Sequence, residues 1–101
     1  MNPELALGTD ELAIVRSILV RILPDNIRVF AFGSRVSGSP KPWSDLDLAI
    51  EGNSPLPLAL LAELVEAFDE SALPWKVDIV DKASVGEGFA RIIDAAKVPI
   101  L

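Results

Sequence analysis

Hydrophobic residues along the chain follow two alternating periods, one typical of helices and one typical of strands. Helical spacing, with an apolar stripe opposite a polar side, occurs in residues 9–22, 57–70 and 84–96. Short apolar runs between turn residues occur in residues 27–32, 45–51 and 75–81. The order predicts a helix, a strand, a loop with a possible short helix, a second strand, a helix, a third strand and a last helix.

Each predicted helix has a face assigned to the core. The expected caps of the first and last helices are Thr9 and Ser84. Ile14 and Val20 extend the apolar surface of the first helix beyond its core stripe, which favours contact with a partner. The inward residues are Leu12, Val15, Ile18, Leu19 and Ile22 in the first helix, Leu61, Leu64, Val65 and Phe68 in the second, and Phe89, Ile92, Ile93 and Ala96 in the last.

The connections between the strands predict a small mixed sheet. A helix between the second and third strands favours a parallel, adjacent pair, whereas the short link between the first two suits an antiparallel pair. The expected fold class is therefore α/β of the α+β type, with a three-stranded sheet and about four helices packed mainly on one face. The other face, which carries the acidic residues described below, is expected to be accessible. We expect a single domain over residues 1–101, with a core at about 9–97.

Composition narrows the chemistry of this 101-residue chain. It has no cysteine and no histidine, which excludes disulfides, zinc sites and nucleophiles that depend on Cys or His, and leaves oxygen ligands suited to Mg²⁺. The formal charge of −6 argues against an extended nucleic-acid surface. No basic leader and no apolar run of transmembrane length is present, so we expect a cytoplasmic protein without a membrane segment.

The candidate chemistry lies around the second strand. Asp45 and Asp47 share one face of it, because residues two apart in a strand point the same way. Asp78 lies in the third strand and joins them if the two strands are neighbours. Charges about 6 Å apart repel by roughly 2–3 kcal/mol per pair at an effective dielectric near 20. Such a cluster must therefore be wet, partly protonated or filled by a cation.

The turn after the first strand offers groups that can bind a phosphate. Gly33 and Ser34 end the strand, and a Gly-Ser turn before a short helix can present backbone N–H groups and a hydroxyl. Arg35 is either a surface charge or a ligand of a triphosphate.

Gly33-Ser34, ten residues, Asp45-x-Asp47 and a later strand Asp78 together resemble the nucleotidyltransferase superfamily that includes DNA polymerase β. The length is similar to its minimal nucleotidyltransferase (MNT) branch, often found as the antitoxin partner of a HEPN-domain toxin. The resemblance covers residues 9 to 97. It departs from the pattern Gly-Ser-Arg-Ala-Arg-Gly at Val36 and Ser37, and Ser37 replaces the second arginine.

The resemblance implies a protein adenylyltransferase that moves AMP from ATP to a hydroxyl, such as that of a tyrosine, on a HEPN toxin. It implies two Mg²⁺ ions on Asp45, Asp47 and Asp78, the nucleotide on Gly33, Ser34 and Arg35, and a hetero-oligomer with the toxin. The alternative is a non-catalytic antitoxin that neutralises its partner by binding only. A third interpretation, an antibiotic-type small-molecule nucleotidyltransferase, is weakened because 101 residues leave no second domain for the acceptor.

Overall fold

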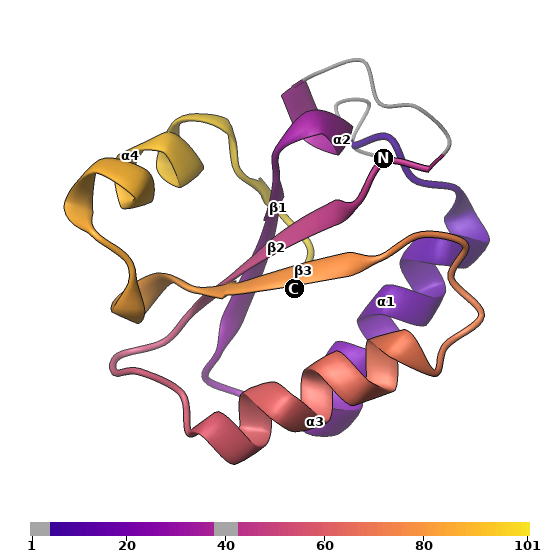
Figure 1. Cartoon of the computed structure of the whole chain (residues 1–101), viewed down its shortest axis with the longest axis horizontal. Helices are drawn as coiled ribbons and strands as arrows, with labels where there is room; N and C mark the ends of the chain where they lie inside the picture. Colours follow the sequence, from indigo (N-terminus) through magenta and orange to yellow (C-terminus); the bar gives the residue numbers. More distant parts are fainter. Residues whose placement is uncertain (1–4, 38–42) are drawn as a thin grey trace.

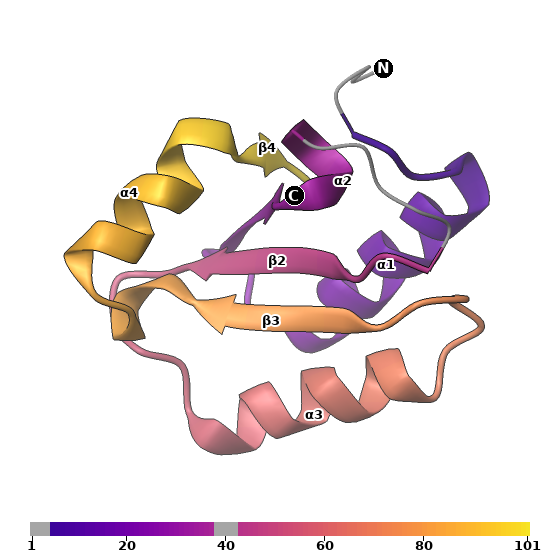
Figure 2. The same cartoon turned by 45° about the horizontal axis from the view of Figure 1, so that its top comes forward.

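The computed structural model of the chain describes residues 5–37 and 43–101, in which helices lie on both faces of a mixed sheet (Figures 1 and 2). Its elements are α1 (Thr9–Ile22), β1 (Arg28–Phe32), α2 (Ser34–Ser37), β2 (Leu46–Glu51), α3 (Leu58–Asp69), β3 (Val77–Asp81), the 3₁₀ turn η1 (Lys82–Ser84), α4 (Glu87–Ala96) and β4 (Val98–Pro99). No helix in these residues has both the length and the apolar character needed to cross a membrane. The order predicted from the pattern is confirmed, including the short helix after β1.

The sheet of the described residues has four strands in the order β3-β2-β1-β4. β1 and β2 are antiparallel and β2 and β3 are parallel, as predicted. The prediction of three strands was wrong, because β4 also pairs antiparallel with β1. β4 has only two residues, too few for a period-two pattern, and Pro99 suits an edge position where no ladder N–H is needed.

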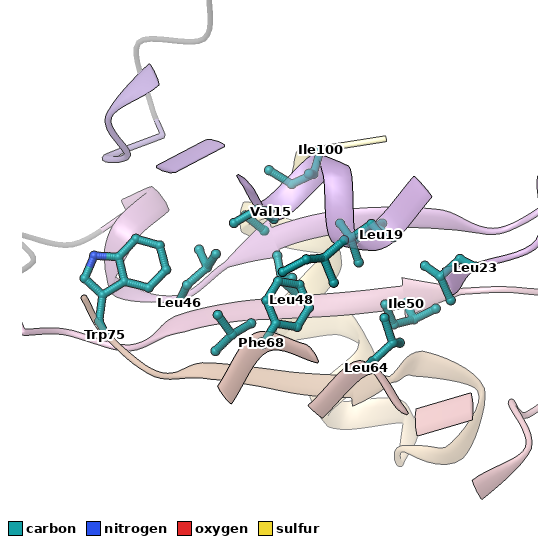
Figure 3. Packing of buried hydrophobic residues seen from close by; sticks show 14 residues of the cluster. Val15, Leu19, Leu23, Leu46, Leu48, Ile50, Leu64, Phe68, Trp75 and Ile100 are labelled. Carbon is teal, nitrogen blue, oxygen red and sulfur yellow. The ribbon is translucent and has the colours of Figure 1, made fainter. Parts of the chain in front are cut away.

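α1 and α3 cover one face of the sheet and build the larger core (Figure 3). From α1, Val15, Ile18 and Leu19 are buried, and from α3, Leu64 and Phe68. The inward side of β2 contributes Leu46, Leu48 and Ile50, all fully buried. The predicted core stripe of α1 is thus confirmed, whereas Val65 of α3 is 45% exposed and the prediction that it points inward was wrong.

α4 packs on the opposite face, over a second small cluster of Phe32, Ala49 and Ile93 with Val80 against it. The ring of Phe89 meets that of Phe32 edge-on, with centroids 6.0 Å apart. Phe89 and Ile92 are nevertheless 42% and 64% exposed, so only part of the predicted inward face of α4 is buried. The expectation of an uncovered acidic face was therefore too simple, because α4 covers part of it.

Both predicted helix caps were wrong by one or more residues. Gly8 precedes α1, and its N–H donates to the Glu11 carboxylate at 2.9 Å. Gly86 precedes α4. Ser84 instead ends η1, where its hydroxyl donates to the buried Asp81 carboxylate, which also accepts the Leu56 N–H at 2.7 Å. A hydroxyl or carboxylate that can cap a helix can equally serve a turn, and the tertiary contacts decide which.

Candidate active site

The acidic residues meet on two neighbouring strands. Asp47 of β2 and Asp78 of β3 are partners in the parallel register, and strands lie about 4.8 Å apart. Leu46 and Leu48 point into the larger core, so alternation places Asp47 on the opposite face. Asp45 is exposed and lies just before β2. The predicted pairing of these strands is confirmed, and it brings Asp47 and Asp78 side by side.

The electrostatics of Asp47 reflect the charges of its acidic neighbours. Partial burial of its carboxyl raises its pKa, and the charges of Asp78 and then Asp45 raise it further. Burial disfavours the charged form because water solvates it better than protein does, and neighbouring negative charges act in the same direction. Protonation or a bound cation would relieve both effects.

Gly33 forms the turn that brings the loop against these acids. Its φ is +81°, a conformation that costs residues with a Cβ about 1–2 kcal/mol. A Cβ built on Gly33 would lie 2.2 Å from Oδ2 of Asp47, closer than any real contact. Phe32, the preceding residue, is the register partner of Asp47. Glycine is therefore required here both by the backbone and by the carboxylate beside it.

The turn continues into α2, where the exposed Ser34 is the first helical residue. Val36 N–H donates to the Gly33 carbonyl at 3.0 Å. The six candidate residues thus fall into two groups. The acids lie on β3, on β2 and just before β2, and the others lie in the Gly33 turn and the start of α2. Of the two departures from the family pattern, Val36 lies in α2 and packs against the larger core. The side chain of Ser37 and residues 38–42 lie outside the described part.

Arg35 is buried, so its interpretation as a surface charge was wrong. Its Nε donates to the Ser44 carbonyl and its Nη1 to the Ala6 carbonyl, each at 3.0 Å. The guanidinium also lies 4.5 Å above the ring of Trp75. Arg35 ties the two ends of the loop to the segment before α1. The role of Trp75 was missed, because nothing in its local sequence indicates a contact 40 residues away along the chain.

The donor set of the site suits a hard cation. In residues 5–37 and 43–101 no group of three acidic residues stands ready as a complete cage for one ion. Mg²⁺ is usually held by one or two carboxylates, with substrate phosphates and water completing its shell. Paired carboxylates beside a glycine turn, with the pKa of Asp47 raised by its neighbours, fit that mode of binding.

The mixed sheet with a Gly-Ser turn beside strand carboxylates has the arrangement that the sequence resemblance implied, and the comparison with known families agrees. The chain belongs to the nucleotidyltransferase domain family, whose model matches residues 12–101.

Among individual relatives, it is 48% identical over 97 residues to the probable protein adenylyltransferase MntA of Haemophilus influenzae. That match covers 96% of this chain and 84% of the relative.

Solved structures share the fold. A toxin–antitoxin crystal structure with AMP-PNP has a TM-score of 0.74 and 23% identity, covering 89% of this chain and 72% of that chain. A tri-AMPylated HEPN toxin of Shewanella oneidensis in complex with its MNT antitoxin has a TM-score of 0.70 and 20% identity, covering 94% and 72%. At these identities the likeness shows the nucleotidyltransferase fold that the sequence predicted.

Proposed function

We propose that this chain is an antitoxin that transfers AMP from ATP to a hydroxyl group, such as that of a tyrosine, on a HEPN toxin. The observation that carries the proposal is the pairing of Asp47 with Asp78 next to Gly33, with Asp45 close enough to raise the pKa of Asp47. The 48% identical relative is named a protein adenylyltransferase, which supports this choice within the family.

Two Mg²⁺ ions would be held by Asp45, Asp47 and Asp78. When bound, they supply neutralisation of the triphosphate charge and stabilise both the attacking and the leaving oxygens. The protein contributes the rigid placement of these carboxylates, since Asp47 is anchored in a strand paired on both sides. Gly33 and Ser34 would hold phosphate oxygens through the N–H groups and the hydroxyl of the turn.

The reaction is an in-line displacement at the α-phosphorus of ATP. The acceptor oxygen forms a bond to the α-phosphorus, the bond to the bridging oxygen of the β-phosphate breaks, and pyrophosphate leaves. Asp78 would take the proton of the acceptor hydroxyl, a role that the family resemblance implies for it. A carboxylate can do so only when it lies within hydrogen-bond distance of the bound hydroxyl.

The partner is proposed from the solved relatives, which are complexes of MNT antitoxins with HEPN toxins. A hetero-oligomer and a cytoplasmic location follow from that proposal. Arg35 as a triphosphate ligand remains a prediction, and its buried contacts with Ser44 and Ala6 indicate a role in holding the loop.

A non-catalytic antitoxin is the second candidate. It is favoured by one observation: apolar side chains such as Val20, 67% exposed, lie on α1, across the sheet from the carboxylates. A partner held there could be neutralised without any transfer of AMP.

The test is transfer of label from ³²P-α-ATP to the HEPN toxin, together with rescue of cells that express the toxin. Replacement of Asp45 and Asp47 by Asn should abolish labelling and rescue while the complex still forms. Asp25 is an exposed acid before β1, at the end opposite to Gly33. Asp25→Asn is the matched control and should behave as the wild type. If the double variant still rescues cells and the wild type never labels the toxin, the binding-only candidate is correct.

A further inference from the structure

A groove of about 670 Å³ lies between α1 and α3, in the helical layer on the sheet face opposite to Asp47. Its floor is apolar, with Ile14, Ile18 and Ile22 from α1 and Ala67 from α3. The isoleucines recur at intervals of four along α1, so the groove follows that helix for about two turns, or roughly 12 Å. Such a length fits two turns of another helix.

The two edges of the groove differ in charge. Along α3 the edge carries Glu63, Glu66 and Glu70, all exposed, at the i, i+3, i+7 spacing of one helical face. Across the groove, the α1 edge carries Arg21 and Ser17. Within residues 5–37 and 43–101, none of the three glutamates has an ion-pair partner. The α3 edge is therefore a row of negative charge about 10 Å long beside an apolar floor.

We propose that this groove docks an amphipathic helix of the toxin, with its apolar stripe on the floor and Lys or Arg residues along the edge next to α3. The charge row selects that chemistry, because cations at helical spacing meet the glutamates in register. A second copy of this chain would offer a single arginine, Arg21, against three glutamates at the groove edges, in a protein of net charge −6, so it matches the row less well. The identity of the partner as the toxin rests on the proposed function.

Docking at the groove leaves the acidic site uncovered. The groove is lined by α1 and α3, whereas Asp47 and Asp78 lie on the other face of the sheet. The antitoxin would thus hold one part of a toxin assembly through the helical layer while the acids face the acceptor hydroxyl. In this arrangement, affinity for the toxin and transfer of AMP can be changed independently, because each depends on a different face of the sheet.

Binding of the full-length chain to the HEPN toxin of the same organism, measured by calorimetry, tests the groove with two matched pairs of variants. Glu66→Lys reverses a charge of the row, whereas Asp69→Lys reverses an exposed charge of the same helix outside the groove. Ala13→Trp fills the groove, whereas Ala62→Trp adds the same bulk to an exposed position outside it. All four positions are exposed, and a thermal melt confirms that each variant is folded.

Glu66→Lys and Ala13→Trp should each weaken binding about tenfold or more, which corresponds to about 1.4 kcal/mol, and each control about twofold or less. Added salt should weaken the wild type more than Glu66→Lys, since one charge contact is already lost. Equal affinities within each pair, no binding of the toxin by the wild type, or a dimer of the chain alone that Ala13→Trp dissociates would overturn the proposal. Labelling of the toxin is scored separately. If the wild type does not label the toxin but its binding depends on the groove, the proposed AMP transfer is refuted and the docking site is supported.

Discussion

Gly33 and Asp47 are so close that only a glycine leaves room for the carboxylate. A Cβ at position 33 would lie 2.2 Å from Oδ2 and 3.1 Å from Cγ of Asp47, and the φ of +81° already disfavours any side chain. The turn proposed to hold phosphate and the acid proposed to hold metal thus lie in close contact. A side chain added at position 33 must therefore displace the Asp47 carboxylate.

Gly33→Ala should destabilise the fold by at least about 1–2 kcal/mol, the cost of the left-handed conformation, and should abolish AMP transfer by moving Asp47. Urea unfolding and the labelling assay measure the two effects. Gly88→Ala is the matched control: a Cβ there meets nothing within 4 Å, and in the first turn of α4 alanine should not destabilise the fold. Normal labelling by Gly33→Ala would contradict the close fit.

Arg35→Lys should destabilise the protein by about 1–3 kcal/mol in the absence of nucleotide. A lysine has a single ammonium group and cannot reproduce the fork that bonds the Ser44 and Ala6 carbonyls while stacking on Trp75. Thermal melts without ligand measure it, with the exposed Arg21→Lys as control. If Arg35→Lys has the same melting temperature as the wild type and only its KM for ATP rises, Arg35 acts as a triphosphate ligand alone.

Asp47→Asn should make the metal-free protein more stable at neutral pH. The folded-state pKa of Asp47 is raised above the unfolded value of 3.8, so the ionised carboxylate penalises folding at any pH above the folded pKa. The advantage of the variant should shrink as pH falls through that pKa towards 3.8. Because Asp47 is only half-buried and water screens its charge, we expect the difference to be small.

Urea unfolding in EDTA between neutral and acid pH measures this difference, with Asp69→Asn, an exposed acid of α3, as the control. A gap between Asp47→Asn and wild type that stays constant with pH, or that grows in acid, would show that the pKa of Asp47 is not raised in the folded protein.

Mg²⁺ with a non-hydrolysable ATP analogue should raise the melting temperature of the wild type. A ligand that binds only the native state stabilises by about 2.7 kcal/mol at 100 times its Kd. The protein in which Asn replaces Asp45 and Asp47 should show no shift with the same ligands, because the carboxylates that would hold the ions are gone. Identical shifts in the two proteins would place the ligands elsewhere on the molecule.

Local patterns in the sequence were sufficient for the framework of the site. The alternation through Leu46, Asp47 and Leu48 fixes which face the acids occupy, and the crossover helix makes β2 and β3 parallel neighbours. Both are short-range rules of backbone geometry and chain connection, which is why the pairing of Asp47 with Asp78 could be predicted. The Gly-Ser turn and the short helix after it were visible for the same reason.

What the sequence could not reveal depends on contacts between distant segments. Arg35 becomes a buried clamp only because Ala6, Ser44 and Trp75 gather around it. β4 is recognisable only by its pairing with β1, and α4 covers part of the acidic face because Ile93 packs on Phe32 and Ala49 there. Packing and the need to satisfy buried polar groups decide each of these three features. A short window of sequence carries no signal of either requirement.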